Sequence, residues 1–240
     1  MTHQITVAEI AVDIVRKDIK NLHLGVYPPD GRVRVAAPLM LDDDAVRMAV
    51  ISKLSWIRKQ ITSFTGQARQ SPREFLPRES HYFLGDRYLL MITETKGKTG
   101  VTLKNSSTLE ILIRPGSSPA RREAILTAWY RSELKRIIPG MIGKWEPILA
   151  VQVSGWGVRK MKTTWGSCNP ASHRILLNLE LVKKPLPCIE YIILHEMLHL
   201  IERRHNDTFH ELLTQHMPKW RLIRDELNAA PLAHETWKKE

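Results

Sequence analysis

Two histidines and one glutamate interrupt an otherwise apolar stretch of the chain, from Tyr191 to Ile201. His195 and His199 are four residues apart, so on a helix their imidazoles lie on one face and can bind the same metal ion. Glu196 stands next to His195, where its carboxylate can reach a water molecule bound to that ion. This pattern is typical of a zinc hydrolase, in which the metal activates the water and the carboxylate removes its proton.

The side chains around this motif predict a buried helix. Apolar residues cover most of its circumference; they are Ile189, Ile192, Ile193, Leu194, Met197, Leu198, Leu200 and Ile201. The alternative is a surface helix that carries these polar residues by chance. A buried carboxylate and two buried imidazoles cost free energy unless they are paired or bind a metal. We therefore favour a metal site.

A catalytic zinc usually has three protein ligands, so a third ligand must follow downstream. The candidates are His205, His210, Glu211, Asp225 and Glu226. On an unbroken helix, His205 would lie about 240° around and about 9 Å beyond His199. The helix must therefore end after roughly Glu202 if His205 is the ligand. Asn206 or Asp207 can then cap a new helix.

The spacing of His195, His199 and His205 equals that of the metzincins. Those proteins have glycine at the position of Glu202, and the sequence shows no obvious Met-turn. These two differences argue against membership of that clan.

The C-terminal half resembles the YgjP-like metal-dependent hydrolases, zincin-type proteins that are distantly similar to SprT-type proteases. The resemblance rests on an ordered series of elements: Trp165-Gly-Ser-Cys168, Ile175 to Asn178 with Leu181, Pro187, Tyr191 to Leu200, and His205 with Phe209. It implies that His195, His199 and His205 are the metal ligands and that Glu196 is the catalytic base. The departures affect the surroundings of the site more than the metal ligands; they are Asn206, His210 and Thr163-Thr164, where the family usually has Ser, Trp and Ser-Arg.

The expected fold class is α+β. We predict a β-rich N-terminal region with a long helix, residues 1–116, followed by a zincin-like helical half with a small sheet, residues 117–240. The boundary follows the turn residues Pro115 to Pro119, where Ser118 can cap the next helix. The predicted strands cover residues 22–26, 33–35, 82–93, 101–113, 151–158 and 174–179. The other predicted helices begin at residues 42–44, 207 and 218, and the helix from Pro119 should break at Pro139.

Composition places few limits on this interpretation. The 240 residues are 43% hydrophobic, which is enough for a substantial core, and no apolar run approaches the length of a membrane span. The N-terminus lacks the features of a signal peptide. With just two cysteines, Cys168 and Cys188, we expect a reducing, cytoplasmic location and no membrane association.

The formal net charge is +11. Such a surplus attracts nucleic acid, nucleotides or acidic proteins by long-range electrostatics. The basic residues are scattered, and the densest cluster near the motifs runs from Arg159 to Lys162. A solvated basic surface is the simpler interpretation.

Several residues near the motif have both a structural and a functional interpretation. Cys168 and Cys188 are expected to be small buried residues, with a thiolate metal ligand from either of them as the alternative. Trp165 is expected to pack beside the site. Tyr191 fits a core tyrosine, although its hydroxyl can also donate to a developing oxyanion. Glu190 and Glu202 fit surface charges, or carboxylates that orient the ligand histidines.

The function that we expect is zinc-dependent hydrolysis of a peptide or protein substrate, with another divalent metal as an alternative to Zn²⁺. Glu196 would serve as the general base. The strand near residues 174–178 would align an extended peptide by edge pairing, as the zincin resemblance implies.

Two other functions remain open. The first is a nucleoside triphosphate pyrophosphohydrolase, in which Arg159, Lys160 and Lys162 would neutralise phosphates. The second is a zinc-stabilised module that binds nucleic acid through the basic surface and does not need Glu196.

Overall fold

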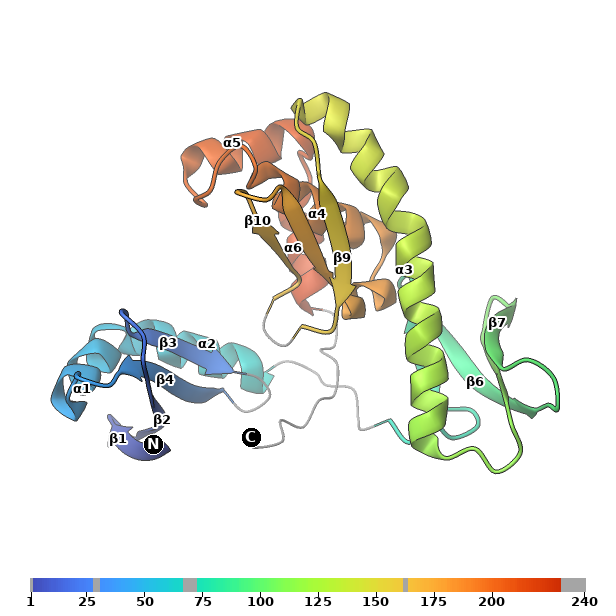
Figure 1. The fold of residues 1–240 in the computed structure, drawn as a ribbon, viewed down its shortest axis with the longest axis horizontal. Helices are drawn as coiled ribbons and strands as arrows, with labels where there is room; N and C mark the ends of the chain where they lie inside the picture. The colour runs from blue at the N-terminus through green and yellow to red at the C-terminus, as the bar shows by residue number, and fades with distance from the viewer. Residues whose placement is uncertain (1, 28–30, 67–72, 162–163, 230–240) are drawn as a thin grey trace. The chain divides into compact units, whose positions relative to one another are not determined.

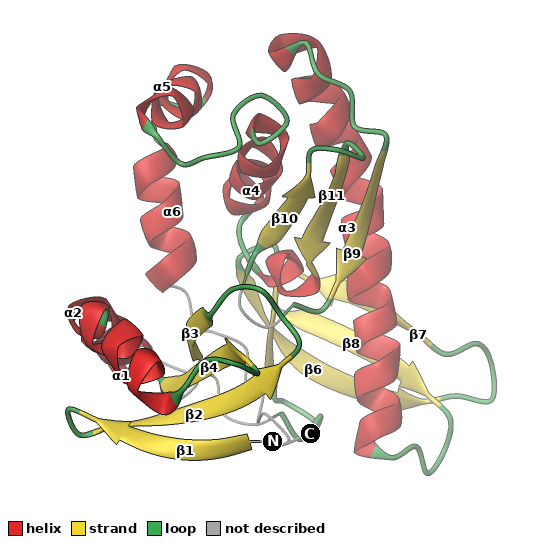
Figure 2. Cartoon of the chain, turned by 60° about the vertical axis from the view of Figure 1, so that its left-hand side comes forward, coloured by secondary structure: helices red, strands yellow, loops and turns green. Residues whose placement is uncertain are grey.

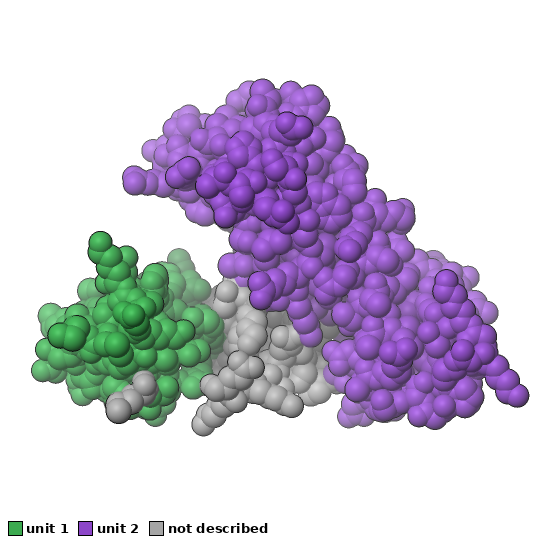
Figure 3. All heavy atoms as spheres, viewed as in Figure 1, with its two compact units in different colours: residues 1–69, 234–240 green, residues 70–233 purple. Residues whose placement is uncertain are grey.

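The computed structural model describes residues 2–27, 31–66, 73–161 and 164–229 (Figure 1). Residues 28–30, Lys162, which is one of the predicted phosphate contacts, and residues 230–240 lie outside this part of the chain. The chain divides into two compact units, residues 1–69 with 234–240 and residues 70–233 (Figure 3). None of the helices in the described ranges is long and apolar enough to cross a bilayer.

The first unit is a four-stranded sheet with two helices. The strands are β1 (Thr2–Val7), β2 (Ile10–Lys17), β3 (His23–Tyr27) and β4 (Arg32–Pro38), in the order β1-β2-β4-β3. The pair β2 and β4 is parallel, and the other two pairs are antiparallel. Alternate residues of the strands, such as Val33 and Val35, are buried in a core shared with α1 (Asp43–Ser52) and α2 (Leu54–Gly66).

The helix expected after Asp42 forms as two helices. The Asp42 carboxylate caps α1 by accepting a hydrogen bond from the Ala45 backbone N–H at 2.7 Å, as predicted. At Lys53 the backbone N–H bonds to Val50 O at 3.1 Å, which tightens the last turn and ends α1. Apolar residues of both helices point into the core, because Val50 and Ile57 are fully buried on either side of the break.

The second unit begins with another four-stranded sheet. Its strands are β5 (Ser80–Phe83), β6 (Asp86–Glu94), β7 (Gly100–Asn105) and β8 (Thr108–Ile113), in the order β5-β6-β8-β7. Each of the two strands expected here is therefore a pair. Gly85, at a φ of +96°, permits the tight turn between β5 and β6.

A single helix, α3 (Pro119–Leu149), follows this sheet. Ser118 caps it and Pro119 occupies its first turn, as predicted. The predicted break at Pro139 is wrong. The helix continues because its buried side chains keep one face on both sides of the proline, and this burial outweighs one lost hydrogen bond. They are Leu126, Tyr130, Leu134, Ile138, Ile142, Trp145 and Leu149.

The remaining elements form the part that carries the metal motif. A three-stranded sheet has the order β10-β11-β9, with β9 (Gly155–Arg159), β10 (Gly166–Asn169) and β11 (Arg174–Asn178). It is followed by η1 (Leu179–Lys183), α4 (Leu186–Leu198), α5 (Asp207–His216) and α6 (Trp220–Ala229). Helix α4 packs against β10, β11, α3 and α6 (Figure 2).

One hydrophobic core runs through the second unit from Phe75 to Leu227, so the sheet β5–β8 shares its core with α3 and α4. The compact units accordingly divide at residues 69 and 70, before this sheet, whereas the expected boundary lay after it at residues 116 and 117. The turn residues that suggested the expected boundary, from Pro115 to Pro119, belong to the short connection between β8 and the start of α3. The expected α+β class is confirmed.

Candidate active site

Helix α4 holds the motif in the interior of the second unit. Its residues Ile193, Leu194 and Met197 are fully buried, and Glu196 is 6% exposed. His195 and His199 are half-buried, on the side of the helix that faces a cleft. The predicted burial of this helix is therefore confirmed.

A turn after α4 brings His205 back to the motif. The helix ends at Leu198, and the Glu202 carboxylate holds the turn by accepting a hydrogen bond from the Arg204 backbone N–H at 2.9 Å. Asn206 then caps α5 by accepting a hydrogen bond from the Phe209 N–H at 3.0 Å. The helix break that His205 requires is thus present, four residues earlier than Glu202.

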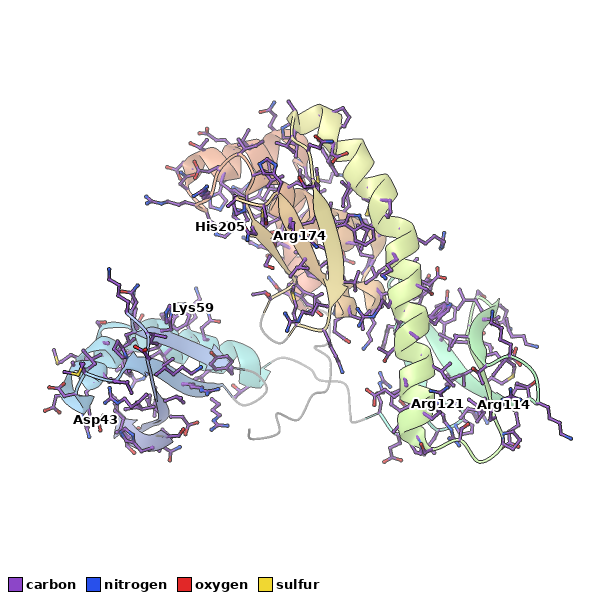
Figure 4. All side chains as sticks on the ribbon, viewed as in Figure 1. Asp43, Lys59, Arg114, Arg121, Arg174 and His205 are labelled. Atoms are coloured by element: carbon purple, nitrogen blue, oxygen red, sulfur yellow. The ribbon has the colours of Figure 1, made fainter. Side chains whose placement is uncertain are left out.

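The three histidine side chains meet at one point (His205 is labelled in Figure 4). One nitrogen from each ring lies within 4.8 Å of the other two, and His205 Nε2 is 2.9 Å from His195 Nε2. The Nδ1–H of His199 donates to the Glu202 carbonyl oxygen at 3.1 Å, which leaves the lone pair of Nε2 for a metal. Three such imidazoles match the ligand set of a catalytic zinc.

Burial disfavours the charged form of two of these imidazoles, those of His195 and His205. It lowers the pKa of His195 to about 3, with a further contribution from His199, His205 and His210. The pKa of His205 is also lowered, again mainly by burial. The Nδ1 atom of His195 is buried and has no hydrogen-bond partner among the described residues. A neutral imidazole can donate a lone pair to a cation, so the donor chemistry fits a divalent metal.

Phe209 lies beneath the three histidines. Its ring centroid is 5.0 Å from that of His195, 4.8 Å from that of His199 and 4.9 Å from that of His205. The side chain is 1% exposed. It therefore forms an apolar floor that contacts all three rings at once.

Glu196 is held against the backbone of β10. A Cβ atom added to Gly166 would be 2.6 Å from Glu196 Oε1. Any residue other than glycine at this position would therefore push the carboxyl group away from β10. Burial raises the pKa of Glu196 to about 8. Burial and the nearby Glu196 raise the pKa of Cys168 to about 11, so this cysteine is a neutral thiol beside the carboxylate.

Glu196 and the three histidines line a cleft of about 600 Å³. One wall is β10 with Trp165, and another is α6, which contributes Arg224 and Leu227. Arg203, from the turn after α4, also lines it. The residue types and spacing of the sequence did not single out Arg203 or Arg224, because neither stands at a recognisable distance from the metal motif.

An aromatic stack supports the α6 wall. Tyr191 is nearly parallel to Trp220, with centroids 6.3 Å apart and an interplanar angle of 8°. His210 stacks on Trp220 at 5.7 Å and 5°. The ring centroid of Tyr191 also lies 5.9 Å from that of His195. Burial raises the pKa of the Tyr191 hydroxyl. Tyr191 thus packs as a core residue and also lines the cleft.

Other candidate residues lie elsewhere. Glu190 accepts hydrogen bonds from Lys144 at 2.5 Å and Trp145 at 3.1 Å, so it joins α4 to α3 and does not orient a ligand histidine. Both cysteines are unpaired, and Cys188 is buried. The remaining ligand candidates do not join the three histidines in a metal-binding group within the described ranges; they are Cys168, His210, Glu211, Asp225 and Glu226.

Two predicted substrate contacts are corrected. Arg159 and Lys160 do not line the cleft. The Nζ atom of Lys160 instead lies 4.0 Å from Oε1 of Glu123 on α3. Lys162 lies outside the described residues. The strand β11, expected to pair with a peptide, is the central strand of its sheet and pairs with β9 and β10 on its two edges. The outer strand beside the cleft is β10, which is not among the predicted strands.

The family profile described as "YgjP-like, metallopeptidase domain" matches residues 20–230, which is most of the chain. The chain belongs to the YgjP-like family. The resemblance noted in the C-terminal half of the sequence is confirmed. At the level of the family, this YgjP-like protein is a metal-dependent hydrolase of the peptidase type, and its family implies a divalent metal.

Two further comparisons add little. None of the curated proteins matches this YgjP-like chain. Among solved structures, the crystal structure of the metallopeptidase zymogen of Pyrococcus abyssi abylysin matches with 19% sequence identity and a TM-score of 0.36. The match covers 38% of this chain and 90% of that chain. At that TM-score the likeness carries no argument.

Proposed function

We propose that this YgjP-like protein is a zinc-dependent peptidase in which His195, His199 and His205 bind the metal and Glu196 is the general base. The observation that supports it best is the convergence of three imidazoles and one buried glutamate side chain on a single cleft. We also propose a cytoplasmic location, which the two unpaired cysteines support.

The roles of the residues follow from their places in the cleft. Bound zinc supplies Lewis-acid polarisation of the scissile carbonyl and lowers the pKa of the attacking water. Glu196 accepts the proton of this water and passes it to the leaving amine. Gly166 lets the carboxylate lie against β10, and burial of α4 keeps bulk water away from it.

The strand β10 is suited to align the substrate. One edge pairs with β11, from Gly166 opposite Leu177 to Asn169 opposite Arg174. In the described part of the chain, no strand pairs with its other edge. An extended peptide can add to such an edge through backbone hydrogen bonds, which do not depend on the peptide sequence.

Hydrolysis of a nucleoside triphosphate is a second candidate. The two guanidiniums of Arg203 and Arg224 in the cleft favour it, since they can bind phosphate oxygens. The contact surface predicted from Arg159 and Lys160 gives it no support, because these residues do not line the cleft.

Metal removal tests the proposal directly. We expect the purified protein to hold one zinc ion per chain, and we expect alanine at His195, His199 or His205 to lose it. Treatment with a zinc chelator should abolish cleavage of an unstructured protein such as casein, and added zinc should restore it. Cleavage that persists in the metal-free protein would contradict the proposal, and hydrolysis of UTP in place of casein would favour the second candidate.

The same treatment is expected to lower the stability of the protein. A ligand at about 100 times its dissociation constant stabilises the folded state by about 2.7 kcal/mol, if it does not bind the unfolded chain. Differential scanning fluorimetry should therefore show a lower Tm for the chelated protein. The His205→Ala variant is the control, since the chelator should leave its Tm nearly unchanged.

Replacement of Gly166 with alanine is expected to slow turnover by about 10²-fold, because displacement of a catalytic group by about 1 Å has effects of this size. The new Cβ would overlap Glu196 Oε1 and push the carboxylate away from β10. Zinc content, measured in parallel, should stay the same.

Gly100→Ala is the matched control for this prediction. Gly100 also stands in a strand, β7, but a Cβ added there meets no atom within 4 Å. Equal turnover in the Gly166→Ala and Gly100→Ala variants would show that the close approach of Gly166 does not position Glu196.

A further inference from the structure

Apart from the metal-binding group, the guanidinium and carboxyl side chains that line the cleft belong to two arginines and one glutamate. The carboxylate is Glu196, which is 6% exposed and is assigned to the reaction. The arginines are Arg203 and Arg224, on two different elements. A substrate that enters the cleft therefore meets two positively charged side chains.

Neither guanidinium is committed to a strong partner. Of the described acidic residues, none forms an ion pair with the Arg203 side chain, and Glu202 bonds to the Arg203 backbone instead. Arg224 contacts its neighbour Asp225, with Nε at 3.1 Å and Nη2 at 2.9 Å from Oδ1. The side chain of Asp225 is 64% exposed, so this ion pair lies in water and is weak. A carboxylate of a substrate can compete with it.

Arg224 is also held in place. Its guanidinium carbon lies 5.1 Å from the centroid of the Trp220 ring. Trp220 is 4% exposed, stacks on Tyr191 and His210, and donates its indole N–H to Thr214 at 3.0 Å. An arginine that rests on a fixed aromatic ring loses less side-chain entropy when it binds an anion.

The neighbours of Arg224 favour a peptide over a nucleotide. Tyr191, Ile192 and Leu227 line the cleft with apolar surface that suits the aliphatic part of an acidic side chain. Two guanidiniums match one carboxylate, whereas a nucleoside triphosphate carries about four negative charges. The open edge of β10 supplies backbone pairing that a nucleotide cannot use.

We propose that Arg203 and Arg224 form a subsite for an acidic residue, so that the enzyme selects peptides with Glu or Asp close to the scissile bond. This inference rests on the proposed peptidase function and adds the class of substrate to it. The arginines are specificity residues: they bind the side chain of the substrate and take no part in proton transfer.

The test uses pairs of fluorogenic peptides that differ by Glu or Gln at one position, scanned along both sides of the scissile bond. The full-length zinc-bound enzyme should prefer the Glu peptide at one position by about 10-fold or more in kcat/KM, the size expected for a charge-assisted hydrogen bond. The preference should shrink as salt is added. The Arg203→Gln/Arg224→Gln double variant should lower the ratio to about one.

Arg221→Gln is the matched control. The guanidinium carbon of Arg221 also lies over the Trp220 ring, 4.6 Å from its centroid, but Arg221 does not line the cleft. This variant should keep the Glu preference of the wild-type enzyme. A charge reversal, Arg224→Glu, should shift the preference towards a peptide with Lys at the same position. If Arg221→Gln removes the preference as fully as the double variant does, the subsite is not at Arg203 and Arg224.

Binding separates this inference from the function on which it rests. Fluorescence anisotropy with the Glu196→Gln variant measures the affinity for the same labelled peptides without turnover, and the Glu peptide should bind about 10-fold more tightly than its Gln partner. Equal cleavage of both peptides, with no effect of the double variant, would overturn the subsite and leave the peptidase intact. Selective Glu binding without any cleavage would support the subsite and overturn the peptidase. Hydrolysis of UTP that depends on both arginines would overturn the acidic-peptide substrate.

Discussion

Replacement of Glu196 with glutamine is expected to reduce turnover by about 10²–10⁴-fold, the usual contribution of a general base. Glutamine has nearly the same shape and can occupy the space against Gly166, but it cannot accept the proton of the attacking water. Since Glu196 is not one of the three converging side chains that we propose as metal ligands, the variant should keep its zinc. Steady-state kinetics and metal quantification on one preparation measure both effects.

Glu190→Gln is the control for this variant. Glu190 lies on the same helix and joins it to Lys144 and Trp145, outside the cleft. The Glu190→Gln variant should change the stability of the protein but leave the rate of the chemical step intact. The hypothesis of a zinc-stabilised nucleic-acid-binding module predicts the opposite for Glu196→Gln, namely full function. Unimpaired turnover in the Glu196→Gln variant would reject Glu196 as the base.

Replacement of Phe209 with alanine is expected to destabilise the protein by about 3–5 kcal/mol, the usual cost of removing a buried aromatic ring. The ring is 1% exposed and contacts all three histidines, so its loss leaves a cavity directly beneath them. The histidine rings should then sample more orientations. We expect zinc affinity to fall by about 10–100-fold, as it does when groups that orient metal ligands are removed.

Phe209→Leu keeps the experiment interpretable if the alanine variant does not fold. Leucine fills much of the space but lacks the flat surface against the imidazoles. Zinc affinity is measured by competition with a chromophoric chelator, and the absorption spectrum of the Co²⁺-substituted protein reports the ligand geometry. Leu213→Ala is the control, because Leu213 is equally buried one turn further along α5. If Leu213→Ala lowers zinc affinity as much as Phe209→Leu, Phe209 acts through general stability alone.

The local part of the site was predictable from the sequence. The spacing of His195 and His199 and the apolar residues around them specify both the helix and its burial. The stereochemistry of a helix then requires a break before His205, and Asn206 provides the expected cap. These predictions hold because they depend on residues close to one another in the chain.

The predictions that failed depend on residues far apart in the chain. Pro139 breaks an isolated helix, but here the side chains of Ile138 and Ile142 are buried against other elements of the second unit. Gly166 has no assigned role in the sequence, because its need to be glycine comes from the contact of β10 with Glu196. Arg203 and Arg224 line the same cleft because the fold brings together the turn after α4 and helix α6. No local pattern encodes such contacts.

The length of α3 has a consequence for how the protein unfolds. At 1.5 Å per residue its 31 residues extend over about 46 Å, and the apolar side chains along it belong to a core that includes both sheets of the second unit. Loss of β5–β8 would expose part of this stripe to water and withdraw support from the helix that carries the zinc motif. The cooperative folding unit of this YgjP-like protein therefore includes a sheet whose residues do not line the cleft, and partial melting of that sheet would be transmitted to the three histidines and Glu196.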